Sequence, residues 1–286
     1  MSRNKDRLGL SDGKAEPSPT PAAAFDSNVF SFVAPTEFVK LPSEGKHYKA
    51  DHPLFNETTI EIKQMTAKEE DILTSVTLIQ NGVALDRLLE SIIVNKNINP
   101  KTLLVGDRNA IIISARVSGY GNTYRTMITC PECITEQAHS FNLNEANVKT
   151  STDIYSNLPN AVEVLDNGNF AVVLPKSQLK AELKLLNGFE ERLLSESLGN
   201  GVDKQNEKLI TTQLSFMIAS VNGNSTREAI EYVSNNLPSS DSTFLRNIYK
   251  NLVPNVDLKL PFTCNHCSHS EDMEVPLNAD FFWPDR

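Results

Sequence analysis

Long apolar runs, basic clusters and cysteines are scarce in this 286-residue chain, and each scarcity narrows what the protein can be. No hydrophobic run approaches the roughly 20 residues that a membrane-spanning helix requires. Residues 1–25 lack the apolar core of a secretory signal. We therefore expect no membrane partner and an intracellular, reducing setting, where cysteines serve more often as metal ligands or catalysts than as disulfides.

The charge balance is acidic, with 27 Lys and Arg, 36 Asp and Glu, and a formal net charge of -9. Such a chain is expected to be soluble and is a poor general binder of polyanions. Because 40% of the residues are hydrophobic, the chain can bury a sizeable core, in one large or two modest domains.

Signatures of the common enzyme classes are absent. The chain has no GxxxxGKS/T phosphate loop, no HExxH and no GxSxG. His47 and His52 lie in a turn-rich segment that is typical of solvated loop histidines, and His139 is expected on a strand. We therefore expect no enzymatic activity and no small-molecule substrate.

Residues 1–28 have the composition of a flexible N-terminal arm. Three prolines, small residues and balanced charges cannot build a core. Two interpretations are open: a disordered tail, or a strap that becomes ordered on a partner.

The first half then shows a series of local signals. Alternation predicts a strand near 58–64, and helical spacing predicts helices after it. Signals for the start and the end of a helix are also present. Thr66 and Glu69 have the spacing of a capping box, and Asn81-Gly82 is a stop signal. The expected elements after Gly82 are a helix carrying Leu85, Leu88, Leu89, Ile92 and Ile93, a helix over 107–117 and a strand over 123–129.

The four cysteines form two CxxC pairs, Cys130 with Cys133 and Cys264 with Cys267. Residues around the pairs match at equal offsets: a threonine precedes each first cysteine, a Leu-Asn follows each pair, and Asp107 stands as far before Cys130 as Asp241 before Cys264. We infer two diverged copies of one α+β unit, each with lead-in strands, helices and a strand–CxxC–strand knuckle.

The predicted fold class is therefore α+β with two tandem units. Their bounds are 29–150, with its knuckle at 130–133, and 163–286, with its knuckle at 264–267; residues 151–162 form a linker. In the second unit, helical patterns occur near 189–197, 208–220, 226–236 and 241–251, and Ser225 with Glu228 is a possible capping box.

The cysteine pattern favours one zinc-ribbon-like site in which Cys130, Cys133, Cys264 and Cys267 hold a structural Zn²⁺. Thiolates bind zinc tetrahedrally at about 2.3 Å, and two facing CxxC turns supply two ligands each. Binding would join the two units and contribute directly to folding. The sequence does not distinguish zinc from iron.

Other interpretations of these residues are weaker. A redox CxxC usually begins a helix beside a βαβ unit, and a structural disulfide is rare in reducing compartments. His266 or His269 is an alternative ligand. Four cysteines would leave no open position for catalysis.

Nucleic-acid binding through the ribbon is also disfavoured. Residues 126–148 and 261–285 contain no Lys or Arg, and both stretches carry acidic residues. Binding to phosphates depends on Lys and Arg, so we expect no nucleic-acid partner.

The aromatic C-terminal end has two interpretations. Phe281, Phe282 and Trp283 either pack on the core of the protein or anchor it in the pocket of a partner, because aromatic residues dominate interface energetics.

Several stretches together resemble the baseplate protein family of T4-like contractile-tailed phages. They are "LPSEGKHY", "MTAKEEDILTS", "LLVGDRNAIIISARVSGYGN", "TCPEC" and "VPLNADFFWP". The resemblance is clearest over 36–145 and the last twenty residues, and it is weaker over 150–260.

The resemblance implies a role in virion assembly without catalysis. The protein would be a baseplate hub subunit in the virion tail, assembled in the host cytoplasm, with other baseplate and tail proteins as partners. The resemblance also implies a metal-ligand role for Cys130 and Cys133, and it assigns no role to the terminal aromatics. One alternative is a hub assembly chaperone absent from the mature virion; another is a zinc-ribbon regulator that binds nucleic acid.

Overall fold

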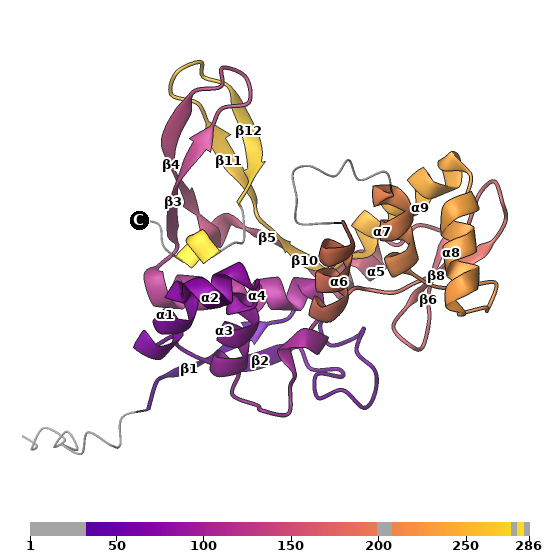
Figure 1. Ribbon diagram of the computed structural model, residues 1–286, viewed down its shortest axis with the longest axis horizontal. Helices are drawn as coiled ribbons and strands as arrows, with labels where there is room; N and C mark the ends of the chain where they lie inside the picture. The colour runs from indigo at the N-terminus through magenta and orange to yellow at the C-terminus, as the bar shows by residue number, and fades with distance from the viewer. Residues whose placement is uncertain (1–32, 199–207, 276–278, 283–286) are drawn as a thin grey trace, which may run out of the picture. The chain divides into compact units, whose positions relative to one another are not determined.

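The computed structural model describes residues 33–198, 208–275 and 279–282. All of these except Val33 belong to one compact unit, residues 34–286. The predicted arm, residues 1–28, lies outside the described residues. Helices and strands occur in both halves of the chain and the strands form antiparallel sheets, so the mixed α+β class is confirmed (Figure 1). Within the described part of the chain, no helix is both long and apolar enough to cross a membrane.

The first half contains the strands and helices expected from its sequence, with two differences. The helix predicted to end at Asn81-Gly82 is divided at Ser75, which is extended, and the short strand Asn147–Lys149 was not predicted. In chain order the elements are β1 (Thr36–Lys40), β2 (Thr59–Lys63), α1 (Ala67–Thr74), α2 (Val76–Gln80), α3 (Ala84–Ile92), the 3-10 helix η2 (Pro100–Thr102), α4 (Val105–Tyr120), β3 (Thr123–Thr129), β4 (Glu136–Asn142), η3 (Leu143–Glu145) and β5 (Asn147–Lys149).

The second half differs from expectation at three places. The predicted linker contains a capped helix, the helix predicted over 208–220 gives way to a strand at Ile218, and the following helix is capped by Thr226 instead of Ser225. The elements are α5 (Ser151–Ser156), β6 (Val162–Val164), β7 (Phe170–Val173), β8 (Lys180–Leu183), α6 (Gly188–Leu198), α7 (Leu209–Met217), β9 (Ile218–Val221), α8 (Arg227–Asn236), α9 (Ser239–Leu252), β10 (Asn255–Asp257), β11 (Lys259–Thr263), β12 (Ser270–Glu274) and η4 (Ala279–Phe282).

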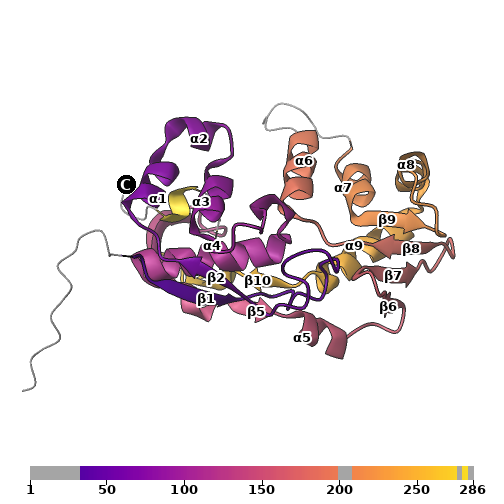
Figure 2. The same cartoon turned by 90° about the horizontal axis from the view of Figure 1, so that it is seen from below.

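The strands form small antiparallel sheets. Strands β6, β7, β8 and β9 lie side by side in that order (Figure 2), while β1 pairs with β2. The two knuckle hairpins are β3–β4 and β11–β12. Strand β10 pairs with β5, with Val256 opposite Val148, so backbone hydrogen bonds join the second half to the first.

Helix α1 begins with the predicted capping box. Thr66 N–H and Oγ1–H both donate to Glu69 Oε2, at 2.9 and 2.6 Å. Lys63, at the end of β2, pairs with the other Glu69 oxygen at 2.8 Å, and Ser91 Oγ donates to it from α3. This buried carboxylate therefore fixes the strand, the start of α1 and α3 relative to one another.

Helix α4 lies at the centre of the core. Ile111 on α4 and Leu88, Leu89 and Ile92 on α3 have exposed fractions of 0%. The start of α4 passes so close to the chain before β10 that a Cβ at Gly106 would lie 2.0 Å from the Pro254 carbonyl oxygen. Glycine at this position permits the close packing of the two halves.

Candidate metal centre

The two knuckles have the same backbone geometry. In the first, Cys130 N–H donates to Thr135 O at 3.0 Å and Ile134 N–H donates to Cys130 O at 2.9 Å. In the second, Cys264 N–H donates to His269 O at 2.8 Å and Ser268 N–H donates to Cys264 O at 3.0 Å. The residue after each second cysteine has a left-handed backbone, with φ of 57° at Ile134 and 59° at Ser268.

The two hairpins lie side by side, as Figure 1 shows for β3–β4 and β11–β12. Gln137 on β4 bridges them, because its Nε2 donates to Thr263 O at 3.1 Å and its Oε1 accepts from Asn265 N–H at 2.8 Å. His139, on β4 as predicted, has its Nε2 at 3.3 Å from Pro261 O. These contacts place the two CxxC turns face to face.

The structure brings all four cysteines together. Their Sγ atoms lie within 4.8 Å of one another, and the pairs Cys130–Cys267 and Cys133–Cys264 are each 3.7 Å apart. A tetrahedral ion with thiolates at about 2.3 Å requires sulfur atoms roughly 3.8 Å apart, whereas a disulfide requires about 2.05 Å. The cluster therefore fits a tetrahedral metal ion and not two disulfides.

The electrostatics of the cluster also suit a cation. A hydrogen bond with Thr135 lowers the pKa of the Cys133 thiol to about 6, and hydrogen bonds with the backbone at Cys267 and His266 lower that of Cys264. At Cys267 the backbone bond to His269 acts in the same direction, but burial and the other thiols outweigh it and raise the pKa to about 12. Neighbouring thiols cannot all ionise unless a positive charge lies between them.

The alternative ligands do not join the cluster. Among the residues that the structure describes, the ligand atoms gathered here are the four thiols, and neither His266 nor His269 is a member. His269 instead has its Nε2 3.6 Å from Glu271.

The terminal aromatics lie away from the knuckle turns. Phe281 and Phe282 have exposed fractions of 0%, and the Phe281 ring is 5.2 Å from that of Tyr124. The Phe281 carbonyl accepts from buried Arg116 Nε at 2.9 Å. These two rings pack on the core of the chain, the first of the two interpretations, while Trp283 lies outside the described residues.

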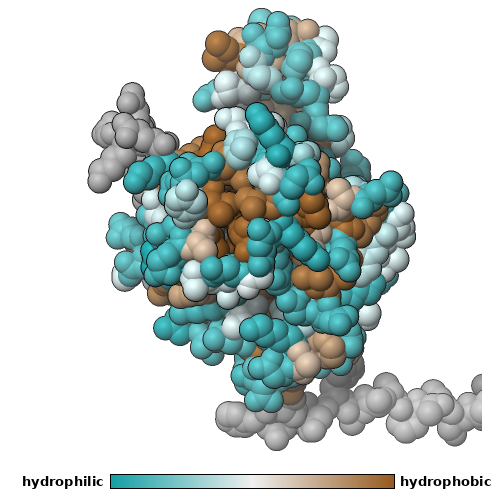
Figure 3. All heavy atoms as spheres, turned by 90° about the vertical axis from the view of Figure 1, so that its right-hand side faces the viewer, coloured by the Kyte–Doolittle hydropathy of each residue, from teal (hydrophilic) through white to brown (hydrophobic). Residues whose placement is uncertain are grey.

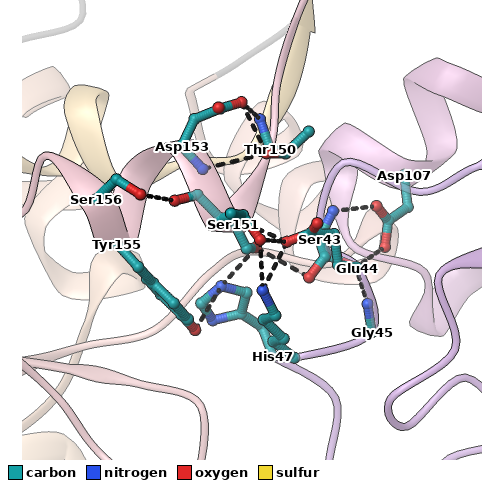
Figure 4. A network of polar contacts seen from close by, with 12 residues as sticks. Ser43, Glu44, Gly45, His47, Asp107, Thr150, Ser151, Asp153, Tyr155 and Ser156 are labelled. Atoms are coloured by element: carbon teal, nitrogen blue, oxygen red, sulfur yellow. Dashed lines mark hydrogen bonds and ion pairs between the residues drawn. The ribbon is translucent and has the colours of Figure 1, made fainter.

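A second polar cluster was missed by the sequence analysis (Figure 4). The interpretation of His47 as a solvated loop residue is wrong, because its Nδ1 lies 2.7 Å from Gly168 O and its Nε2 3.0 Å from Ser151 Oγ. Burial lowers the pKa of His47. The sequence around His47 gave no sign of this burial, because its partners lie more than a hundred residues away along the chain. His52 is also partly buried, stacked on Tyr48 with ring centroids 4.3 Å apart.

A buried aspartate near the start of α4 is connected to this cluster through Ser43, which bonds to both Asp107 and Ser151. Asp107 accepts from Ser43 N–H at 2.9 Å, Ser43 Oγ at 2.6 Å and Tyr48 OH at 2.8 Å. Burial raises the pKa of Asp107, and the hydrogen bonds from Ser43 and Tyr48 oppose that rise. Ser43 lies in the loop after β1, so the aspartate fastens that loop to the central helix.

Together the fold and the cluster define a mixed α+β protein with four cysteines that could hold one metal ion. The family model described as "T4 bacteriophage base plate protein" matches residues 34–283. The chain belongs to this family of phage base plate proteins. The comparisons with curated proteins and with solved structures found no match.

Proposed function

We propose that this protein is a non-enzymatic structural component of the hub of a phage tail baseplate, located in the virion and bound to other baseplate and tail proteins. The family match, which spans residues 34–283, carries the proposal. Within the His47 cluster, Ser151 is not available as a nucleophile, because it has an exposed fraction of 0% and its Oγ donates to Ser43 O at 2.9 Å. A hydroxyl enclosed in this way cannot reach a substrate.

The metal in this proposal is a structural Zn²⁺ held by Cys130, Cys133, Cys264 and Cys267. The thiol spacing supports it, because the 3.7 Å pairs match a tetrahedral ion. All four protein ligands are thiols, and a closed site of this kind is typical of structural zinc. The ion would join the first knuckle to the second.

The two-unit organisation is the next part of the proposal, with units 29–150 and 163–286. Helix α6 begins with a capping box like that of α1: Asn187 N–H donates to Glu190 Oε2 at 3.2 Å, and Glu190 N–H donates to Asn187 Oδ1 at 2.9 Å. Lys184, six residues before Glu190, pairs with that carboxylate as Lys63 pairs with Glu69.

The aspartates at matching offsets have matching roles. Asp241, in the first turn of α9, accepts from Lys176 N–H at 3.0 Å and Ser177 N–H at 2.9 Å. These donors follow the Leu174-Pro175 pair, as Ser43 follows Leu41-Pro42. In each half, therefore, an aspartate near the start of the long helix binds the loop that follows a Leu-Pro pair, after β1 in the first half and after β7 in the second.

The proposed partners need contact surfaces, and large apolar side chains are exposed on two neighbouring helices. Figure 3 shows one face of the molecule, on which apolar residues gather within a polar surround. Helices α6 and α7 expose Phe189 by 52%, Leu193 by 37%, Leu209 by 42% and Ile210 by 43%. Exposed apolar groups on a folded protein commonly mark sites of protein contact.

Quantitative mass spectrometry of purified phage particles tests the proposal. We expect the chain at a fixed ratio to other baseplate proteins. A chain abundant in infected cells but absent from particles would instead be an assembly chaperone. A salt-dependent shift of DNA or RNA by the purified chain would favour the nucleic-acid regulator, which the exposed acidic strand β12 opposes.

A further inference from the structure

We propose that the open edge of β1 receives an extended strand from another baseplate protein. This inference rests on the proposed function for the identity of the partner. Among the described residues, β1 pairs on one side with β2 and has no strand on the other. Strand β7, in contrast, is paired on both sides, with β6 and with β8.

The two strands occupy corresponding places. Strand β1 is followed by Leu41-Pro42 and pairs with β2, while β7 is followed by Leu174-Pro175 and pairs with β8. Aligning the two Leu-Pro pairs places buried Val39 with buried Val172 and Phe38 with Ala171. The outer side of β7 is covered by β6, as Figure 2 shows.

The hydrogen-bond alternation fixes which backbone groups the open edge offers. Leu41 N–H donates to Thr58 O at 2.9 Å, so every second residue back from Leu41 bonds to β2, and Val39 is one of them. The backbone N–H and C=O of Phe38 therefore point away from β2. In the other sheet the same alternation directs Ala171 toward β6, where it is paired with Glu163.

Strand β1 carries charged residues at Glu37 and Lys40, but the residue at the centre of its open edge is Phe38. Edge strands that must avoid pairing commonly carry charged residues or proline at the exposed position. Here the central residue is a phenylalanine with an exposed fraction of 71%, whereas Ala171 is exposed by 3%. A main-chain donor and acceptor beside an exposed aromatic ring are the features that strand addition uses.

The register of β6 defines the expected occupant. In an antiparallel strand placed on β1 as β6 is on β7, one residue lies opposite Val39, the next opposite Phe38 and the third opposite Glu37. The first would point toward the buried face, as Val162 does, and the second would lie beside the Phe38 ring. We therefore expect an extended protein segment with two consecutive apolar residues, followed by a polar or basic one.

The substitution Phe38→Pro tests the inference in the full chain. Proline removes the outward N–H but none of the β1–β2 bonds, and it is tolerated at such edge positions. The melting temperature of the isolated variant should stay close to that of the wild type, while its incorporation into tails assembled without wild-type chain should fall roughly tenfold, as for one lost backbone pair. Phe38→Ala, which keeps the N–H, should incorporate better than Phe38→Pro.

Two controls separate the possible outcomes. Ala171→Pro should lower the melting temperature of the isolated chain, because the N–H of Ala171 is already bonded within the sheet. Equal incorporation of wild type and Phe38→Pro, or equal losses in the proline and alanine variants, would overturn strand addition. Failure of the wild type to enter tails would instead contradict the proposed function.

Amide hydrogen exchange distinguishes a partner strand from a second copy of the chain and from a segment of the chain itself. In the isolated chain the Phe38 amide should exchange fast and the Ala171 amide slowly, and the Phe38 amide should become protected in assembled baseplates. Protection already present in the isolated chain would overturn a partner strand: if dilution removes it, a second copy is the occupant, and if dilution does not, the chain covers its own edge.

Discussion

At the scale of single residues, Glu69 is the clearest electrostatic contributor to stability. Burial alone would raise its pKa, but hydrogen bonds from Lys63, Ser91 and Thr66 outweigh that effect and lower it to about 2, from 4.5 for an ordinary glutamate. The unfolded chain therefore binds this proton more tightly than the folded chain. The resulting stabilisation is complete above about pH 4.5 and is lost as the pH falls toward 2.

We predict that Glu69→Gln lowers the free energy of unfolding by about 2–3 kcal/mol at pH 7 and by little near pH 2. Urea titrations of the two proteins across this range measure the difference. Glu90→Gln is the control, since the Glu90 side chain is 59% exposed and its pair with Arg87 should contribute less than about 1 kcal/mol. A loss for Glu69→Gln that does not vary with pH would contradict the assignment.

The close packing around Gly106 predicts that a larger residue there destabilises the fold. Alanine there would place its Cβ 2.0 Å from the Pro254 carbonyl oxygen, so the contact between α4 and the chain before β10 must open. We expect Gly106→Ala to destabilise the protein by roughly 2–4 kcal/mol, measured by chemical denaturation. At Gly119, also on α4, the added Cβ meets the flexible end of Met65, so Gly119→Ala should cost far less.

Residues in local motifs were predictable from the sequence, whereas residues with distant partners were not. The capping box of Thr66 and Glu69 involves atoms three positions apart, and the structure confirms it. The prediction of Ser225 as a cap was wrong by one position, because Thr226 accepts from Ala229 N–H. His47 was misjudged for a different reason: its neighbours come from α5 and the turn before β7.

At the scale of elements, the two knuckles act as one unit. We predict that Cys133→Ser reduces bound zinc by most of one equivalent and lowers the melting temperature, because a thiolate ligand is lost. Elemental analysis and calorimetry of the purified protein measure the two effects. His266→Gln is the matched control and should keep its metal; if Cys133→Ser also keeps stoichiometric zinc and its stability, the four-thiolate assignment is wrong.

The sequence predicted the strand–turn–strand form of each knuckle, since CxxC turns and alternating strands are local patterns. It did not predict that the linker would contain α5, although Thr150 and Asp153 form a capping box there. The pairing of β5 with β10 was also missed. Strands of three residues carry too little periodicity to be recognised without their partners.

At the scale of the whole molecule, the proposed ion joins segments 134 residues apart, from Cys130 to Cys264. Removing it with a strong chelator should lower the melting temperature of the wild type, and one equivalent of zinc should restore it. The Cys133→Ser variant should show neither change. An unchanged wild-type melting temperature after verified metal loss would show that contacts such as β5–β10 hold the halves together without the ion.

The most direct test of the account is a cryo-EM map of the intact tail tip. We predict density for residues 34–198 and 208–275 within the baseplate hub, with a strong peak between the sulfur atoms of Cys130, Cys133, Cys264 and Cys267. A well-resolved hub that lacks this chain, or that contains it with the two knuckles apart and no peak between them, would contradict the account.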